Sequence, residues 1–180
     1  MAEATLIEPL QDRVFGGNGV TLTPLNKCER ISLRAEDKAV AGLGKAIGLS
    51  LPTKPGTSVT KSGISALLIG PDEWFVTGPQ GSNLEEKLNG VTGALYSVVS
   101  VDHRNTGLTI SGPKAVLALA SGNARDLSME AFPIGGCSRT QLGKAEIILW
   151  RLEENRFHIE CWRSFSDYVW KFLVDAARTA

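Results

Sequence analysis

Two similar halves, joined by one short polar stretch, constrain the fold of this chain more than any other feature of its sequence. Each half reads in order as a strand, a helix, a loop rich in proline and glycine, a pair of strands and a second helix. Between the halves, the valines of 98–101 run into the polar residues 102–105. Leu108 and Ile110 then alternate with polar residues, as in a half-buried strand. The chain is therefore expected to leave one structural unit and enter a second one at this point.

The first half, about residues 20–100, has clear start and stop signals for its elements. Gly70-Pro71-Asp72 predicts a turn between two apolar strands. Ser82, with Glu85 three residues later, has the pattern of a capping box, which begins a helix. The expected elements are strands at 20–23, 28–34, 64–69 and 74–76, and helices that begin near Glu36 and Ser82.

The second half, about residues 101–180, repeats this order. Pro113 is expected in the first turn of a helix, because that position needs no backbone N–H. Ser164 with Asp167 repeats the capping signal before the last helix. The expected elements are a helix at 116–120, strands at 146–152 and 157–162, and a last helix whose apolar stripe runs from Phe165 to Ala176.

An alignment of the halves predicts an internal duplication. It pairs Leu33 with Ile110, Gly56 with Gly135, Phe75 with Phe157, and Ser82 with Ser164. The spacing between paired residues grows along the chain, as loop insertions would produce. We therefore expect an α+β fold in which two intertwined sheets form a pseudo-twofold pair of strand-helix-strand-strand-helix units. Residues 1–19 are expected to be an N-terminal arm that frays or docks, and residues 20–180 a single duplicated domain.

Composition excludes several classes of protein. The 180 residues carry 19 basic and 19 acidic side chains, so no overall field attracts nucleic acid or an anionic membrane. No apolar run approaches the roughly 18 to 20 residues that span a bilayer, and the N-terminus lacks the pattern of a signal peptide. The three cysteines are widely and irregularly spaced, which argues against a disulfide framework. We expect a cytoplasmic protein that binds neither nucleic acid nor membrane.

No metal or cofactor site is expected in this chain. Its two histidines are His103 and His158, and His158 lies three residues from Cys161 on a predicted strand, so these two side chains point to opposite faces. The chain contains no Cys-x-x-Cys pair, which structural zinc sites commonly use. The glycines of 42–48 lie inside a predicted helix, whereas a dinucleotide-binding fingerprint forms the turn from a strand into a helix.

No catalytic centre is expected either. Cys137 follows two glycines in a predicted loop and is the thiol best placed to react, but no partner base accompanies it. Asp102, His103 and Arg104 bring an acid, an imidazole and a cation to a strand end, again without a nucleophile. We expect these three residues to form an ordered turn or to contact a partner protein.

Aromatic and arginine residues near the C-terminus are further candidates for partner contacts. Trp162 and Arg163 are residue types that anchor protein interfaces. Trp170 lies about 100° around the last helix from Val169, at the flank of the apolar stripe. It can therefore either pack in the core or contact a partner.

Several ordered motifs resemble one family. The most specific are Gly70-Pro71-Asp72-Glu73-Trp74 and Arg163-Ser164-Phe165-Ser166-Asp167-Tyr168. Arg30–Arg34, Val99–Arg104 and Leu149–Leu152 continue the pattern, which extends from about Val20 to the end of the chain. These stretches resemble the gamma subunit of heterotetrameric sarcosine oxidase.

The resemblance implies both a fold and a role. The family is similar to a shortened folate-binding domain of the glycine-cleavage aminomethyltransferase, a fold with internal duplication. It implies assembly with alpha, beta and delta subunits into an enzyme that oxidises sarcosine to glycine and hydrogen peroxide, passing the one-carbon unit to tetrahydrofolate. FAD, FMN, NAD, tetrahydrofolate and zinc are then expected in the partner subunits. The gamma subunit itself is expected to have no catalytic residues.

Two alternatives remain open. The chain could be a stand-alone folate-binding or one-carbon-transfer protein with the same fold. A third reading is an iron–sulfur assembly factor of the same superfamily, whose Lys-Gly-Cys-Tyr-x-Gly-Gln motif the residues 135–141 match poorly. The first hypothesis, a non-catalytic assembly subunit, is the one we adopt.

Overall fold

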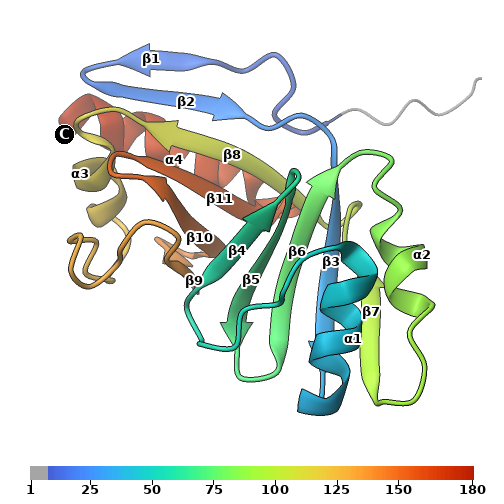
Figure 1. Ribbon diagram of the computed structural model, residues 1–180. Coiled ribbons are helices and arrows are strands. Elements are labelled where there is room, and N and C mark those ends of the chain that lie inside the picture. Colours follow the sequence, from blue (N-terminus) through green and yellow to red (C-terminus); the bar gives the residue numbers. More distant parts are fainter. Residues whose placement is uncertain (1–7) are drawn as a thin grey trace, which may run out of the picture.

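The computed structural model describes residues 8–180, which form two antiparallel sheets (Figure 1). The six-stranded sheet contains, in spatial order, β1 (Phe15–Gly17), β2 (Val20–Pro24), β8 (Asn105–Ser111), β11 (Arg156–Trp162), β10 (Ala145–Glu153) and β9 (Cys137–Leu142). The five-stranded sheet contains β4 (Ser58–Lys61), β5 (Ile64–Gly70), β6 (Glu73–Pro79), β3 (Cys28–Ala35) and β7 (Tyr96–Ser100). The expected mixed fold with two sheets is therefore confirmed.

Each sheet carries its own pair of helices (Figure 1). Against the five-stranded sheet lie α1 (Asp37–Ile47) and α2 (Leu84–Asn89). Against the six-stranded sheet lie α3 (Ala115–Ala120) and α4 (Ser166–Thr179), and a short 3₁₀ turn, η1 (Arg163–Phe165), leads into α4. Successive side chains of each strand point to opposite faces of its sheet. Each helix pair packs on one of these faces and covers a separate apolar core.

The chain passes from one sheet to the other at the predicted junction. Strand β7 ends the first series of elements beside β3, and β8 begins the second series in the middle of the six-stranded sheet. Strand β2 precedes both series but pairs with β8, with Leu22 opposite Ile110. The N-terminal segment therefore completes the sheet that the C-terminal half builds.

Between the two sheets lies a third, smaller apolar cluster of Leu67, Phe75, Val101, Cys137 and Ile148. At its margin the backbones of the two halves pair directly: Ser58 N–H donates to the Gly135 carbonyl at 3.0 Å, and Cys137 N–H donates to the Gly56 carbonyl at 2.9 Å. The two halves are thus joined by apolar packing and by backbone hydrogen bonds.

Both predicted capping boxes are wrong. Helix α2 begins after Asn83, and the side chain of Glu29 on β3 accepts hydrogen bonds from the N–H groups of Gly81, Asn83 and Leu84 at 2.8–3.0 Å. A carboxylate from another strand thus satisfies the free N–H groups at the start of this helix, where negative charge is favourable. At the second site, Ser164 lies within η1 instead of capping α4.

Other differences concern short strands and Pro113. The glycines of 16–19 belong to a hairpin between β1 and β2, not to a free turn, and Leu10 of the arm is buried in the core. Strands β4 and β9 were not expected, because neither has a strong apolar alternation. Pro113 precedes α3, which begins at Ala115, so it does not lie in the first turn.

Candidate functional site

The junction residues form an ordered turn that is open to solvent on one side. The Asp102 carboxylate accepts a hydrogen bond from the backbone N–H of Arg30 at 2.5 Å, which fixes the turn to β3. The backbone N–H groups of Arg104 and Asn105 both donate to the Val101 carbonyl. His103 and Arg104 are exposed. The turn is therefore held by its backbone and by Asp102, and it presents an imidazole and a cation.

Two of the predicted C-terminal candidates lie directly beside this turn. Trp162 at the end of β11 pairs with Asn105 at the start of β8, and its ring lies 5.7 Å from the guanidinium carbon of Arg104, an arrangement typical of a cation–π contact. Arg163 N–H donates to the Arg104 carbonyl at 2.8 Å. Trp162 is nevertheless 44% exposed. His103, Arg104, Trp162 and Arg163 thus share one surface, which we call the junction patch.

Trp170 does not belong to this patch. It is 8% exposed and packs in the core between α4 and the six-stranded sheet. Of its two predicted roles, core packing is the one observed. Phe165, which was expected in the apolar stripe of the last helix, is instead 39% exposed.

A buried ionic network lies behind the junction turn and was missed by sequence reasoning. Arg30 on β3 reaches across the space between the sheets, and its Nε lies 2.8 Å from Oε2 of Glu160 on β11. His158 Nε2 lies 2.8 Å from the other oxygen, Oε1. The side chains of Arg30 and Glu160 are 4% and 1% exposed. Sequence does not single these residues out, because β3 also carries Glu29 and Arg34, and β11 also carries Arg156.

The network keeps Glu160 ionised. Burial alone would raise the pKa of its carboxyl, but the hydrogen bond and charge of His158 and the charge of Arg30 outweigh burial and hold the pKa below its ordinary value. Space for the carboxylate exists because Gly107 lies opposite Glu160; a side chain at Gly107 would meet Oε1 at 2.5 Å. Both carboxylate oxygens are engaged and shielded from solvent, so the group is arranged to join the sheets and not to transfer protons.

The cysteines are not poised to react. Cys137 is the first residue of β9 and is 1% exposed, so it does not lie in a loop as predicted. Burial raises the pKa of its thiol to about 12, and burial likewise raises the pKa of Cys161 to about 12. Because the thiolate is the nucleophilic form, neither residue is suited to covalent catalysis.

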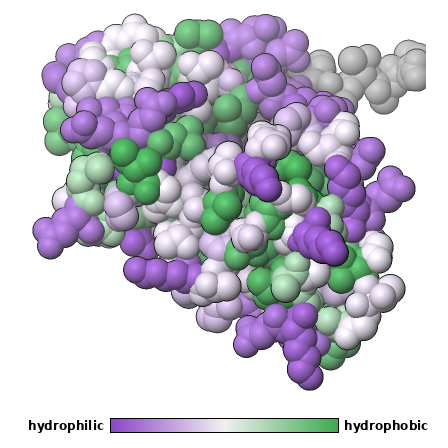
Figure 2. Space-filling view, in the orientation of Figure 1, coloured by the Kyte–Doolittle hydropathy of each residue, from purple (hydrophilic) through white to green (hydrophobic). Residues whose placement is uncertain are grey.

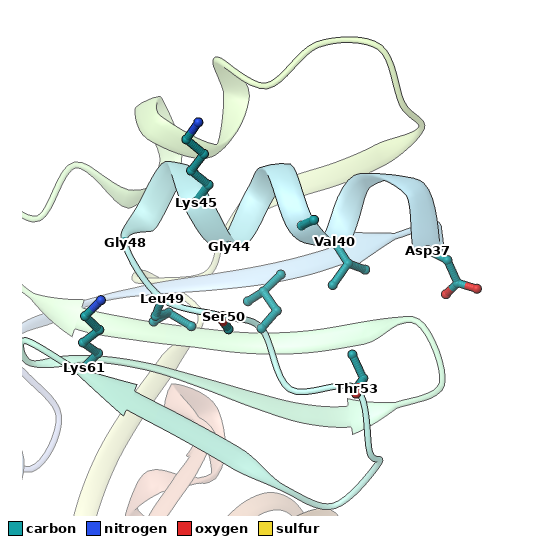
Figure 3. Close-up of a pocket in the computed structure, with 11 residues that line it drawn as sticks. Asp37, Val40, Gly44, Lys45, Gly48, Leu49, Ser50, Thr53 and Lys61 are labelled. Atoms are coloured by element: carbon teal, nitrogen blue, oxygen red, sulfur yellow. The ribbon is translucent and has the colours of Figure 1, made fainter.

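An open groove of about 860 Å³ lies between α1 and the segment 49–53 (Figure 3). In Figure 3, Lys45 and Lys61 lie toward one end of the groove and Asp37 toward the other. Gly44 lines the groove, and it must be glycine because an added Cβ would lie 2.6 Å from the Leu49 carbonyl oxygen. Figure 2 shows hydrophobic and hydrophilic residues intermixed over this part of the surface. The groove contains no convergent set of polar groups comparable to the buried network.

Neither a metal centre nor a membrane span is evident in residues 8–180. Within that range, no three His, Cys, Asp or Glu side chains are grouped so that they could hold a metal ion. No helix in the same range is both long enough and apolar enough to cross a bilayer.

Comparison with known proteins identifies the family. A model described as the sarcosine oxidase gamma subunit family matches residues 33–179. The sarcosine oxidase subunit gamma of Corynebacterium sp. strain P-1 is 30% identical over 138 residues, which are 76% of this chain and 68% of that protein. The corresponding subunit of Corynebacterium sp. strain U-96 is 29% identical over 167 residues, 91% of this chain and 82% of that protein.

Solved structures agree with the sequence comparison. The chain superposes on one in the heterotetrameric sarcosine oxidase from Corynebacterium sp. U-96 in complex with pyrrole 2-carboxylate, with a TM-score of 0.88 and 26% identity over 97% of this chain and 95% of that one. It also has the fold of part of aminomethyltransferase T from Bartonella henselae, with a TM-score of 0.65 and 16% identity over 93% of this chain and 47% of that one. This chain belongs to the sarcosine oxidase gamma subunit family.

Proposed function

We propose that this chain is a non-catalytic subunit of a heterotetrameric sarcosine oxidase, whose role is to support assembly with the alpha, beta and delta subunits. The likeness to a chain of the heterotetrameric enzyme over 97% of its own length is the observation that carries the proposal. The buried, fully paired network and the high thiol pKa values agree with a role other than catalysis. The complex oxidises sarcosine to glycine, hydrogen peroxide and a one-carbon unit bound to tetrahydrofolate.

The junction patch is the surface that we assign to a partner. It combines an exposed tryptophan with two arginines and a histidine, and it is ordered before any partner binds, because backbone hydrogen bonds and Asp102 fix its turn. Tryptophan and arginine dominate the energetics of many interfaces, and a rigid anchor loses little conformational entropy on binding.

The duplication, too, is part of the proposal. The strand order β4-β5-β6-β3-β7 corresponds position by position to β9-β10-β11-β8-β2. Gly56 and Gly135, which the sequence alignment pairs, have φ values of 80° and 83°. Each glycine carbonyl accepts a hydrogen bond from the other half, and each glycine N–H donates to a strand of its own half, to Leu68 and Arg151 respectively. We infer that 20–100 and 101–180 are two copies of one unit. In the six-stranded sheet, β2 takes the position beside β8 that β7 takes beside β3 in the five-stranded sheet.

FAD, FMN, NAD, tetrahydrofolate and zinc are assigned to the partner subunits as part of the same proposal. Cytoplasmic localisation is supported by Cys28, Cys137 and Cys161, all of which carry free thiols. These assignments rest on the family and on the cysteine chemistry.

Co-purification tests the assembly role. When the tagged chain is expressed with the alpha, beta and delta subunits, all three should co-purify with it, and Trp162→Ala should retain about tenfold less of them, as expected for an anchor worth 1–2 kcal/mol. Leu117→Ala, at a site that is 57% exposed on α3, is the matched control and should leave retention unchanged. If the unsubstituted chain retains no companion and instead binds tetrahydrofolate in a calorimeter, the stand-alone folate-binding alternative replaces this proposal.

A further inference from the structure

The free edge of β7 suggests how a companion subunit is held. Strand β7 ends the five-stranded sheet and, among residues 8–180, pairs with β3 alone (Figure 1). Glu36 N–H donates to the Leu95 carbonyl, and Val101 N–H donates to the Arg30 carbonyl. In an antiparallel ladder, successive residues bond alternately toward the neighbouring strand and away from it. Leu95 and Val101 bond toward the β3 side, so every second residue between them does the same. The N–H and C=O groups of Tyr96, Val98 and Ser100 point outward, away from β3.

This edge lacks the features that usually protect a free edge. Natural edge strands carry lysine, proline or bulges, or are very short, so that they do not pair with other chains. The edge strand β4 ends in Lys61, β9 carries Arg139, and β1 is only 3 residues long. Strand β7 is 5 residues long, contains no charge and no proline, and pairs with β3 without a register shift. In the sequence, no charged residue occurs between Lys87 and Asp102.

Apolar side chains accompany the open backbone. Val99 lies on the face that continues into the layer between the two sheets, since it pairs with Ser32, which pairs in turn with Phe75 of the inter-sheet cluster. Val99 is 51% exposed, and Leu95, just before the strand, is 77% exposed. A strand added here would cover both backbone and apolar surface.

The other sheet shows what such an edge receives. In the position-by-position correspondence of the sheets, β2 is the counterpart of β7, and the outer edge of β2 is covered by β1, with Phe15 opposite Leu22. The counterpart edge at β7 has no such cover within residues 8–180. The same architecture therefore accommodates one more strand at this place.

We propose that β7 receives an extended segment of a companion subunit as a sixth strand of the five-stranded sheet. The occupant is a segment with alternating apolar residues, which bonds to the outward backbone groups of Tyr96, Val98 and Ser100 and packs on Val99. This is β-strand addition, in which main-chain bonds supply affinity. The inference rests on the proposed assembly function and goes further by naming the element and the mode of contact.

Proline substitution on the two edges of the same sheet tests this mode. Ser100→Pro removes one outward N–H of β7 and leaves the ladder to β3 intact. Thr60→Pro is the matched control: Thr60 is exposed on β4, and its N–H also points away from the neighbouring strand. Ser100→Pro should lower retention of the companion subunits about tenfold, because a buried partner carbonyl loses its donor. Thr60→Pro should retain them like the unsubstituted chain.

Hydrogen exchange gives an independent readout on the unsubstituted protein. In the complex, the peptide that covers 95–101 should gain protection of about three amide hydrogens relative to the isolated chain, one for each outward N–H group. The exchange of the peptide that covers 58–61 should not change. Equal retention of both proline variants, together with unchanged exchange at 95–101, would overturn the proposal. Protection at 95–101 that depends on the concentration of the isolated chain would assign the edge to a second copy and would overturn it as well. If the unsubstituted chain retains no companion, the proposed function itself fails, which is a different outcome.

Discussion

Replacing Glu160 by glutamine should lower the free energy of unfolding by about 3–5 kcal/mol, as measured for other buried ion pairs that lose one partner. Glutamine keeps the volume of the side chain and can still accept a hydrogen bond. However, the Arg30 guanidinium, 2.8 Å away and almost fully buried, would lose its counter-charge. The loss is large because water cannot replace the missing carboxylate at a site between two sheets. Urea denaturation of the full chain measures it.

An exposed carboxylate provides the control. Glu146 lies 3.8 Å from Arg139 with 53% of its side chain exposed, and Glu146→Gln should change the free energy of unfolding by less than about 1 kcal/mol. The double variant Arg30→Met/Glu160→Gln should lose less stability than the sum of the losses in the two single variants. The reason is that it removes both charges of the pair and leaves neither of them buried alone. If Glu160→Gln and Glu146→Gln prove equally mild, the network does not hold the sheets together.

The same residue sets an acid limit on stability. Because the folded state holds the pKa of Glu160 below its unfolded value of about 4.3, folding is favoured above that pH by the ionised carboxylate. The contribution should be fully present at neutral pH and should decrease as the pH falls from about 4.3 through the folded pKa. The stability difference between the native chain and Glu160→Gln should therefore be large at pH 7 and shrink in acid. A difference that grows in acid would contradict this assignment.

Replacing Gly112 by alanine should be the second severe change, with a loss of about 3 kcal/mol or more from backbone strain and overlap together. Gly112 has φ +117°, which side chains rarely adopt, and an added Cβ would overlap the Gly19 carbonyl oxygen and lie 3.0 Å from its carbon. This carbonyl accepts the Lys114 N–H in the native fold, so it cannot move freely. The substitution should detach the β1–β2 hairpin from β8.

Gly16→Ala is the matched control on the same hairpin. No atom lies within 4 Å of the position of an added Cβ at Gly16, so the melting temperature should change little. Thermal unfolding and amide exchange across β2 measure both variants. A Gly112→Ala variant as stable as Gly16→Ala, with β2 still protected, would mean that the close approach of Gly19 to Gly112 does not constrain the hairpin.

Much of the secondary structure follows from local pattern. The turn Gly70-Pro71-Asp72 separates β5 and β6 as predicted, the acidic residues at 36–37 lie at the start of α1, and the polar stretch after Val101 separates the sheets. Each of these signals lies within a few neighbouring residues. Period and turn chemistry are sufficient to locate them.

The failure at α2 depends on a contact between residues that are far apart in the sequence. Ser82 and Glu85 satisfy the capping pattern, but Glu29 caps α2 from another strand. Strand β9 has no strong apolar alternation of its own, and it forms a local hairpin with β10.

The candidate surface was predicted only in part, for the same reason as the start of α2. The junction patch was found as two separate stretches, and only the pairing of β8 with β11 brings Arg104 and Trp162 together. The link from Arg30 to Glu160 spans 130 residues, and no local pattern indicates it.

The most direct test of the assembly role is to purify the tagged chain from its own cells and to record the intact mass and the visible spectrum of what is recovered. We predict a yellow complex that contains three companion subunits in about equal amounts and oxidises sarcosine. A colourless chain recovered alone would contradict the account.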